Sequence, residues 1–299
     1  MVLRIEGAAV KQLKTGDLTF TAYEMGQGPL VLCMHGFPDT PYTFRHLLPA
    51  LAQAGFRAIA VTMRGYEPSS QPKGGEYGAA ALTHDVIGWM DALGERQAHL
   101  IGHDWGASIT YAAAALAPDR IRSITAMAVP HPAGFATVGL KDWGQLRRSW
   151  YMFFFQWKGV SDRKVERNDW RFLETLWRRW SPGWATSADD LSNLKATFAQ
   201  SGVREAALAY YRAAFNQKAP RYAEGAALFA KPISAPTLGL CGERDGCISA
   251  DVFEKSMLPA LFASEVTIKR IPNAGHFLQL EQPAAVNGEI LAFLNRQRA

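Results

Sequence analysis

Short apolar segments alternate with helical segments over the first half of the chain, and this alternation constrains the fold more than any other feature. The segments that predict strands are GPLVLCMHG, GFRAIAVTMRG, RQAHLIGHD and IRSITAMAVPHP. The segments between them that predict helices are YTFRHLLPALAQAG, ALTHDVIGWMDALG and GASITYAAAALAP. Strands that alternate with helices pair in parallel through right-handed crossovers, so we expect an α/β fold with a mostly parallel central sheet. An earlier segment, LTFTAYEMG, suits an antiparallel edge strand or hairpin.

The second feature is a long interruption of this series. Residues 133–228 contain no strand candidate and instead hold helical segments dense in tryptophan and arginine, such as DWGQLRRSWYMFFFQWKG. Strands resume with APTLGLCGERD and SEVTIKRIPNAGH, and an amphipathic helix closes the chain. We therefore predict a core domain of residues 1–132 and 229–299 with an inserted helical cap of residues 133–228. Such a cap would cover the carboxyl ends of the strands, where α/β sheets bind ligands.

Composition places the chain among globular proteins and indicates no insertion into a membrane. It has 299 residues, 48% of them hydrophobic and 20% charged, and its longest apolar runs are far shorter than a membrane span. The first residues lack the apolar stretch of a signal peptide, so we expect a cytoplasmic protein.

Cysteine spacing and charge favour neither a metal site nor nucleic-acid binding. Cys33, Cys241 and Cys247 form no CxxC pair or Cys/His cluster, so we expect reduced cysteines. The reaction that the motifs below indicate needs neither a metal nor an organic cofactor, so we expect none. The net charge is +5, but Lys and Arg are scattered, with a modest concentration between Arg147 and Arg179. A solvated helix face explains that concentration better than nucleic acid does.

The motif GHDWGA follows a predicted strand and opens a predicted helix. Its glycines permit a tight turn that holds Asp104 at the strand end, beside the amino terminus of the helix. An ordinary helix-capping aspartate is the alternative, because Asp is a favoured cap.

Two later loops favour catalysis over capping. CGERDGC places Asp245 after one strand, and PNAGHFLQLEQP places His276 after the next. Taken singly, Asp245 suits a turn and His276 suits a packed loop. Together with Asp104 they follow the order nucleophile, acid and base, which is the order of α/β-hydrolases.

The segment MHGFPDT supplies a fourth part. The backbone N–H groups of Phe37 and Trp105 can converge on one point and form an oxyanion hole. The Phe37-Pro38 peptide suits a cis bond in a fixed turn. We interpret His35 as a buried hydrogen-bonding residue rather than a catalyst.

These segments together resemble the epoxide-hydrolase branch of the α/β-hydrolase superfamily: HGFP, MRGYEPSSQP, GHDWGA, the Asp245 loop and GHF. The resemblance covers nearly the whole chain and implies an aspartate nucleophile and a helical cap. It also implies two cap tyrosines that donate protons. The segments SWYMFFFQ and AYYRAAF assign these roles to Tyr151 and Tyr211, with Tyr210 as the rival for the second role.

An aspartate nucleophile indicates substitution at a saturated carbon. Serine attacking such a carbon would leave an ether that resists hydrolysis, whereas a carboxylate leaves an ester that water can cleave. The leaving group is then an epoxide oxygen or a halide. An epoxide oxygen needs a proton, which a neutral tyrosine can donate. We expect a small apolar epoxide and water as the reactants.

Several alternatives stay open at this point. A haloalkane dehalogenase uses the same triad, and the tryptophans of the cap permit a halide site, although Phe37 stands where such enzymes often have Asn. A haloacid dehalogenase would have arginines near the motif, and a ligand receptor would not need the whole triad. The side chains that we expect to line an apolar substrate pocket are Phe37, Pro38, Trp105, Phe154, Phe155 and Phe277. The sequence allows a monomer or a homodimer.

Overall fold

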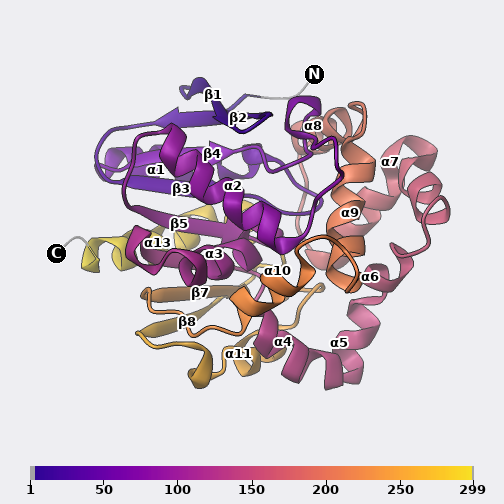
Figure 1. The fold of residues 1–299 in the computed structure, drawn as a ribbon. Coiled ribbons are helices and arrows are strands. Elements are labelled where there is room, and N and C mark those ends of the chain that lie inside the picture. The colour runs from indigo at the N-terminus through magenta and orange to yellow at the C-terminus, as the bar shows by residue number, and fades with distance from the viewer. Residues whose placement is uncertain (1–3, 298–299) are drawn as a thin grey trace.

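An eight-stranded sheet forms the centre of the molecule (Figure 1), in the order β1-β2-β4-β3-β5-β6-β7-β8. The computed structural model describes residues 4–297. The strands are β1 (Ala9–Thr15), β2 (Leu18–Met25), β3 (Leu30–Met34), β4 (Arg57–Val61), β5 (Ala98–His103), β6 (Ile121–Met127), β7 (Thr237–Gly242) and β8 (Val266–Ile271). β2 pairs antiparallel with β1 and β4, and the other neighbours pair in parallel. The α/β class and the mostly parallel sheet are therefore confirmed.

The antiparallel part of the sheet differs in one detail from the sequence prediction. The segment LTFTAYEM forms β2 and takes part in a hairpin, as expected, but β1 and not β2 is the edge strand. β1 escaped prediction because its sequence, AVKQLKT, buries only Leu13. An edge strand with polar side chains on both faces leaves little hydrophobic pattern to detect.

Helices cover both faces of the sheet, and the strand β3 shows how the sequence divides between them. Leu30, Leu32 and Met34 point into one apolar core, whereas Val31 and Cys33 point into the other. The second core is closed by α1 (Leu47–Gln53) and α13 (Pro283–Arg296), and the first by α2 (Ala79–Ala92), α3 (Trp105–Leu116) and α11 (Ala250–Ser256). A strand buried on both faces reads as a continuous apolar run, as LVLCM does.

Between β6 and β7 the described chain contains helices and no strand, as the sequence predicts. These helices are α4 (Pro132–Val138), α5 (Trp143–Arg148), α6 (Trp150–Phe154), α7 (Val160–Trp180), α8 (Ala188–Phe198), α9 (Val203–Phe215) and α10 (Tyr222–Phe229). We call residues 132–229 the helical block; its division from the core at residues 133 and 228 stays a prediction. In Figure 1, α5 to α9 form a layer beside the sheet. None of the helices in residues 4–297 is long and apolar enough to cross a bilayer.

The longest helix of the block is not continuous. α7 leaves the helical conformation from Arg167 to Trp170, where three consecutive residues have positive φ. Its second half ends at Trp180, directly against the loops that follow β7 and β8. The short helix α12 (Leu278–Glu281) continues the second of these loops.

Candidate active site

Asp104 lies in the sharp turn between β5 and α3, with φ 54° and ψ −116°. This positive φ is unusual for a residue with a side chain, and the two flanking glycines make the turn possible. A Cβ on Gly102 would lie 2.2 Å from the Gly106 carbonyl oxygen, and one on Gly106 would lie 2.1 Å from that of Met34. The turn therefore requires glycine at both positions, and it presents the Asp104 carboxylate at the carboxyl end of the sheet.

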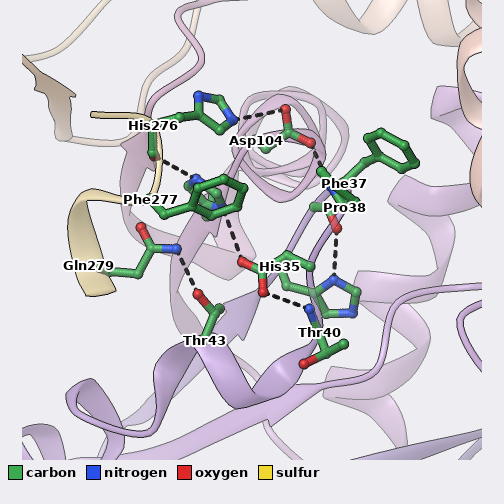
Figure 2. Close-up of polar contacts among 12 residues, drawn as sticks. His35, Phe37, Pro38, Thr40, Thr43, Asp104, His276, Phe277 and Gln279 are labelled. Atoms are coloured by element: carbon green, nitrogen blue, oxygen red, sulfur yellow. Dashed lines mark hydrogen bonds and ion pairs between the residues drawn. The ribbon is translucent and has the colours of Figure 1, made fainter. Parts of the chain in front are cut away.

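The loop after β3 holds one oxygen of this carboxylate. The backbone N–H of Phe37 donates a hydrogen bond of 2.7 Å to Asp104 Oδ1 (Figure 2). The loop can approach so closely because Gly36 has no side chain; a Cβ there would lie 2.3 Å from the same oxygen. The Phe37-Pro38 peptide is cis, as predicted. The N–H of Trp105, in the first turn of α3, is the second predicted donor, and Gly36 packs directly against its nitrogen.

His276 and Asp245 complete a buried triad with Asp104. His276 Nδ1 lies 2.9 Å from Asp245 Oδ2, and its Nε2 lies 3.6 Å from Asp104 Oδ2. The N–H groups of Cys247 and Ile248 both donate to Asp245 Oδ1, at 2.6 and 3.0 Å. These two bonds hold the Asp245 carboxylate so that its other oxygen faces the imidazole.

The charges of this triad decide the protonation of the histidine. Burial opposes the charged imidazolium, but the neighbouring carboxylates of Asp245 and Asp104 outweigh burial and raise the pKa of His276 well above its usual value. Loss of the negative charge on Asp104 would remove one of these contributions. The basicity of His276 is therefore coupled to the chemical state of Asp104.

Tyr151 on α6 and Tyr211 on α9 face Asp104 from the helical block. All three residues line one cavity of about 430 Å³, and the two tyrosine rings are 5.6 Å apart. The Tyr151 hydroxyl lies 3.3 Å from Cys247 Sγ, and the buried Tyr211 hydroxyl has no well-formed hydrogen bond within the described residues. Burial, reinforced by the Asp104 carboxylate, raises the pKa of both tyrosines well above the usual value, so both stay protonated.

Tyr210, the rival for the second position, differs from Tyr211 in what its hydroxyl contacts. The Tyr210 hydroxyl donates a bond of 2.6 Å to the backbone carbonyl of Arg64. Its ring stacks on Tyr77 at 6.0 Å. The Tyr210 hydroxyl is therefore already hydrogen-bonded within the protein, whereas the Tyr211 hydroxyl can donate to a ligand.

Only some of the side chains that were predicted to line an apolar substrate pocket lie at or near this cavity. Of the six side chains expected there, Trp105 lines the cavity within residues 4–297. Phe37 and Phe155 lie behind Tyr211, with ring centroids 5.2 and 5.1 Å from its ring. Among the apolar residues that sequence reasoning missed, the cavity is lined by Val129, Phe135, Met152, Phe229 and Ile248. They are scattered over three helices and two loops, and no local pattern marks them.

The other three predicted contacts lie elsewhere. Phe277 packs on the His276 ring at 5.2 Å, and the Pro38 carbonyl accepts a bond of 2.7 Å from the Trp177 indole N–H. Phe154 packs against Trp150 and Phe172 and lines a separate hollow. Phe154 thus lies outside the lining of the cavity that holds Asp104, and its predicted substrate contact stays a prediction. α6 is a helix of five residues, and its side chains diverge toward different neighbours.

His35 has the structural role that the sequence indicated. Its Nδ1 lies 3.0 Å from the Gly36 carbonyl, and its Nε2 accepts from the N–H of Met63 at 3.1 Å. Burial lowers the pKa of His35 to about 4, so the ring is neutral and ties two loops together.

Comparison with known proteins agrees with this geometry. Residues 29–283 match the model of the alpha/beta hydrolase fold family. An epoxide hydrolase of Caballeronia sordidicola is 32% identical, with 96% of this chain and 94% of the relative covered. The chain belongs to the α/β-hydrolase family, in its epoxide-hydrolase branch. Epoxide hydrolase 1 of Caenorhabditis elegans is 30% identical, over 95% of this chain and 69% of that protein.

The fold comparison gives the same result. The crystal structure of epoxide hydrolase A from Mycobacterium thermoresistibile superposes with a TM-score of 0.79 at 27% identity, covering 96% of this chain and 98% of the other. An epoxide hydrolase from an endophytic Streptomyces superposes with a TM-score of 0.77 at 29% identity, covering 98% and 97%.

Within this family fold, the end of α7 holds the loops that carry Asp245 and His276, a contact that the sequence analysis did not predict. The Trp180 carbonyl accepts from the N–H groups of both Gly246 and His276, at 2.9 and 3.0 Å. The Phe277 N–H donates to Ser181 Oγ at 3.1 Å. The one sequence signal for this close approach was Gly246, because a Cβ at this position would lie 1.9 Å from the Arg179 carbonyl oxygen.

One group in the site has the side-chain types of a metal centre. Ligand atoms of Asp245, Cys247 and His276 lie within 4.8 Å of one another. The hydrogen bonds already described explain their arrangement, since the Asp245 carboxylate is shared by two N–H groups and the imidazole. We assign these residues to the triad and its surroundings.

Proposed function

We propose that this protein hydrolyses epoxides to vicinal diols through a covalent ester on Asp104. One observation carries the proposal: a carboxylate and two protonated tyrosine hydroxyls face one another across a largely apolar cavity of about 430 Å³. The names of the relatives in the epoxide-hydrolase branch support it.

In the first step, Asp104 Oδ2 attacks an epoxide carbon while Oδ1 stays bound to the Phe37 N–H. The carbon–oxygen bond of the epoxide breaks, and its electron pair stays on the oxygen. Tyr151 and Tyr211 donate hydrogen bonds to this oxygen, and one of them transfers its proton. The product of this step is a hydroxyalkyl ester of Asp104.

In the second step, His276 becomes the base. Ester formation removes the negative charge of Asp104, so one of the interactions that raise the pKa of His276 is lost. The imidazolium can then return a proton to the tyrosinate through water in the cavity, which leaves a neutral imidazole. This imidazole deprotonates the water that attacks the ester carbonyl, and the resulting oxyanion is bound by the N–H groups of Phe37 and Trp105. When this oxyanion collapses, the bond between the carbonyl carbon and the alkyl oxygen breaks, and the diol leaves with the proton of the newly added hydroxyl. Asp104 is then a carboxylate again beside the His276 imidazolium, so the cycle uses only side chains and water.

The two tyrosines also favour an epoxide over a halide. A halide departs as a stable anion and needs no proton, whereas an alkoxide must be protonated. Because the cavity walls are largely apolar, we propose a small apolar epoxide as the substrate class.

The decisive experiment separates the two steps. We expect His276→Gln to form the ester and fail to hydrolyse it, because attack by a carboxylate needs no base. After incubation with styrene oxide, intact-protein mass spectrometry should show the addition of one epoxide mass, and digestion should place it on the peptide containing Asp104. The control is the double variant His276→Gln with Asp104→Ala, which should stay unmodified. An unmodified His276→Gln that still binds the epoxide would contradict the covalent mechanism.

A further inference from the structure

Exposed large apolar side chains are concentrated on the helical block. Seven such side chains are exposed among the described residues, and six of them belong to the block: Leu140, Trp143, Phe153, Trp157, Val160 and Phe215. Trp143 is 81% exposed and Trp157 is 66% exposed. Single exposed apolar residues are normal, but six on one helical block, including two highly exposed tryptophans, indicate an interaction surface.

Basic side chains lie between these apolar residues. A hollow between α5 and the end of α7 is lined by Arg147, Arg148, Arg178 and Arg179 together with Trp150. A second hollow, at the start of α7, is lined by Trp150, Phe154, Val160, Arg163, Lys164 and Arg167. Trp150 belongs to both hollows, so they adjoin. We call residues 140–179 on α5, α6 and α7 the outer band, and Figure 1 shows these helices at the side of the molecule away from the sheet.

The outer band carries the whole net charge of the protein. Residues 141–179 contain ten Lys and Arg against five Asp and Glu, and the net charge of the chain is also +5. Four of these acidic residues pair with basic residues outside the band: Asp162 with Arg212, Glu166 with Arg204, and Asp169 and Glu174 with Lys195. Within the described residues, none of the ten basic side chains has an acidic partner. The positive charge is therefore uncompensated.

We propose that the outer band docks the protein on the surface of an anionic phospholipid bilayer, without crossing it. Exposed tryptophan and phenylalanine interleaved with Arg and Lys suit the interface of a bilayer, where rings enter the headgroup region and cations meet lipid phosphates. A second copy of the chain fits less well, because a symmetric contact through this face brings like charges together.

Docking by this face would place the cavity beside the lipid. Met152 lines the active-site cavity, and the next residue, Phe153, is exposed and packs on Phe215 at 5.6 Å. An apolar epoxide concentrates in a bilayer rather than in water, so the docked protein would receive substrate from the lipid. The docking itself does not depend on the chemistry proposed for the triad, and its test measures binding alone.

The test is co-sedimentation of the purified protein with two kinds of vesicle, one of phosphatidylcholine alone and one containing phosphatidylglycerol as well. We expect binding to the anionic vesicles only, and loss of binding at about 1 M salt, where the Debye length falls to about 3 Å. The charge variant is Arg147→Gln, Arg148→Gln, Arg178→Gln and Arg179→Gln together. It should bind the anionic vesicles at least about tenfold more weakly, since each basic residue near such a surface contributes.

The matched control removes the same charge from exposed positions of the core: Lys14→Gln, Lys73→Gln, Arg96→Gln and Lys269→Gln together. It should bind within about twofold of the unaltered protein. Trp143→Ala with Trp157→Ala should also weaken binding, with the melting temperature of each variant reporting its folding. Equal binding to neutral vesicles, absence of binding, or equal loss in the control would overturn the proposal. So would a sedimentation experiment in which the tryptophan variant only converts a dimer to a monomer, because a second copy would then cover the band.

Discussion

The two walls of the catalytic cavity are built in different ways. On the wall formed by the strand ends, backbone N–H groups hold the carboxylates of Asp104 and Asp245, and glycines allow the loops to approach. On the wall formed by the helical block, the Tyr211 hydroxyl has no well-formed partner among residues 4–297, and the Tyr151 hydroxyl is near the sulfur of Cys247. In the mechanism proposed above, the first wall holds the atoms that would form and break a covalent bond. The second leaves its donors free for an oxygen that moves during the reaction.

The largest loss of activity should come from a substitution on the wall formed by the strand ends. We expect Asp104→Ala to lower diol formation by at least about 10⁴-fold, because losing one residue of a catalytic triad can cost nearly as much activity as losing all three. Product analysis by chromatography measures the loss. Because Ala lacks the carboxylate, the variant should also show no mass gain with the epoxide. Diol formation near the rate of the unaltered protein would mean that water attacks the epoxide directly.

Substitutions on the wall formed by the helical block should each slow epoxide opening in part, and their effects should depend on one another. We expect Tyr151→Phe and Tyr211→Phe each to slow epoxide opening by about 10² to 10³-fold, because one hydrogen bond to the developing oxyanion disappears. The double variant should be close to inactive. Single-turnover kinetics of ester formation measures the step concerned. If the double variant opened the epoxide at the normal rate, the assignment of the proton donors would be wrong.

Tyr210→Phe sharpens the contrast, because the same kind of change should now affect folding and not catalysis. The Arg64 carbonyl would lose its hydrogen bond, so we expect the free energy of unfolding to fall by about 1–2 kcal/mol. The rate of epoxide opening should stay within about twofold of the unaltered protein. Denaturant titration and single-turnover kinetics give the two numbers. A large kinetic loss with unchanged stability would move the second donor role to Tyr210.

The smallest effect concerns the pH dependence of stability. The pKa of His276 is raised in the folded protein, so its protonation contributes stability that is fully present below about pH 6.5, the value for an unfolded histidine. This contribution is lost as the pH rises through the folded value. The melting temperature of the unaltered protein, relative to that of His276→Gln, should therefore decline above about pH 6.5. A parallel pair of melting curves at all pH values would show that the pKa is not raised.

The same contrast explains what the sequence could predict. The turn at Asp104 and the loop at Phe37 need glycine and proline at fixed positions, and such requirements leave short, local motifs. Tyr151 and Tyr211 were assigned only through the family resemblance, because an aromatic run on a helix has no pattern that distinguishes packing from catalysis. The same ambiguity applies to the substrate contact predicted for Phe154.

Other features leave at most one or two residues as a signal, such as Gly246 beside the end of α7. The contacts of Trp180 join residues that are more than sixty positions apart, and they use a backbone carbonyl that every residue type possesses. The edge strand β1 buries one side chain, and the break in α7 is marked only by Asn168 and Asp169, residue types that adopt positive φ more often than most. Hydrophobic periodicity indicates which face of a helix or strand is buried, and these features do not depend on such a buried face.

The end of α7 is bonded to three loops at once, so the position of this helix and the positions of the loops are coupled. The stretch from Trp177 to Ser181 is bonded to Pro38, Gly246, His276 and Phe277 at once, so this end of the block cannot lift away as a hinged cover while the site keeps its alignment. Any motion that exposes the site from that side would also displace His276 and the loop that carries Phe37 and Pro38. Access to the proposed ester from this side is thus tied to the alignment that its hydrolysis would need.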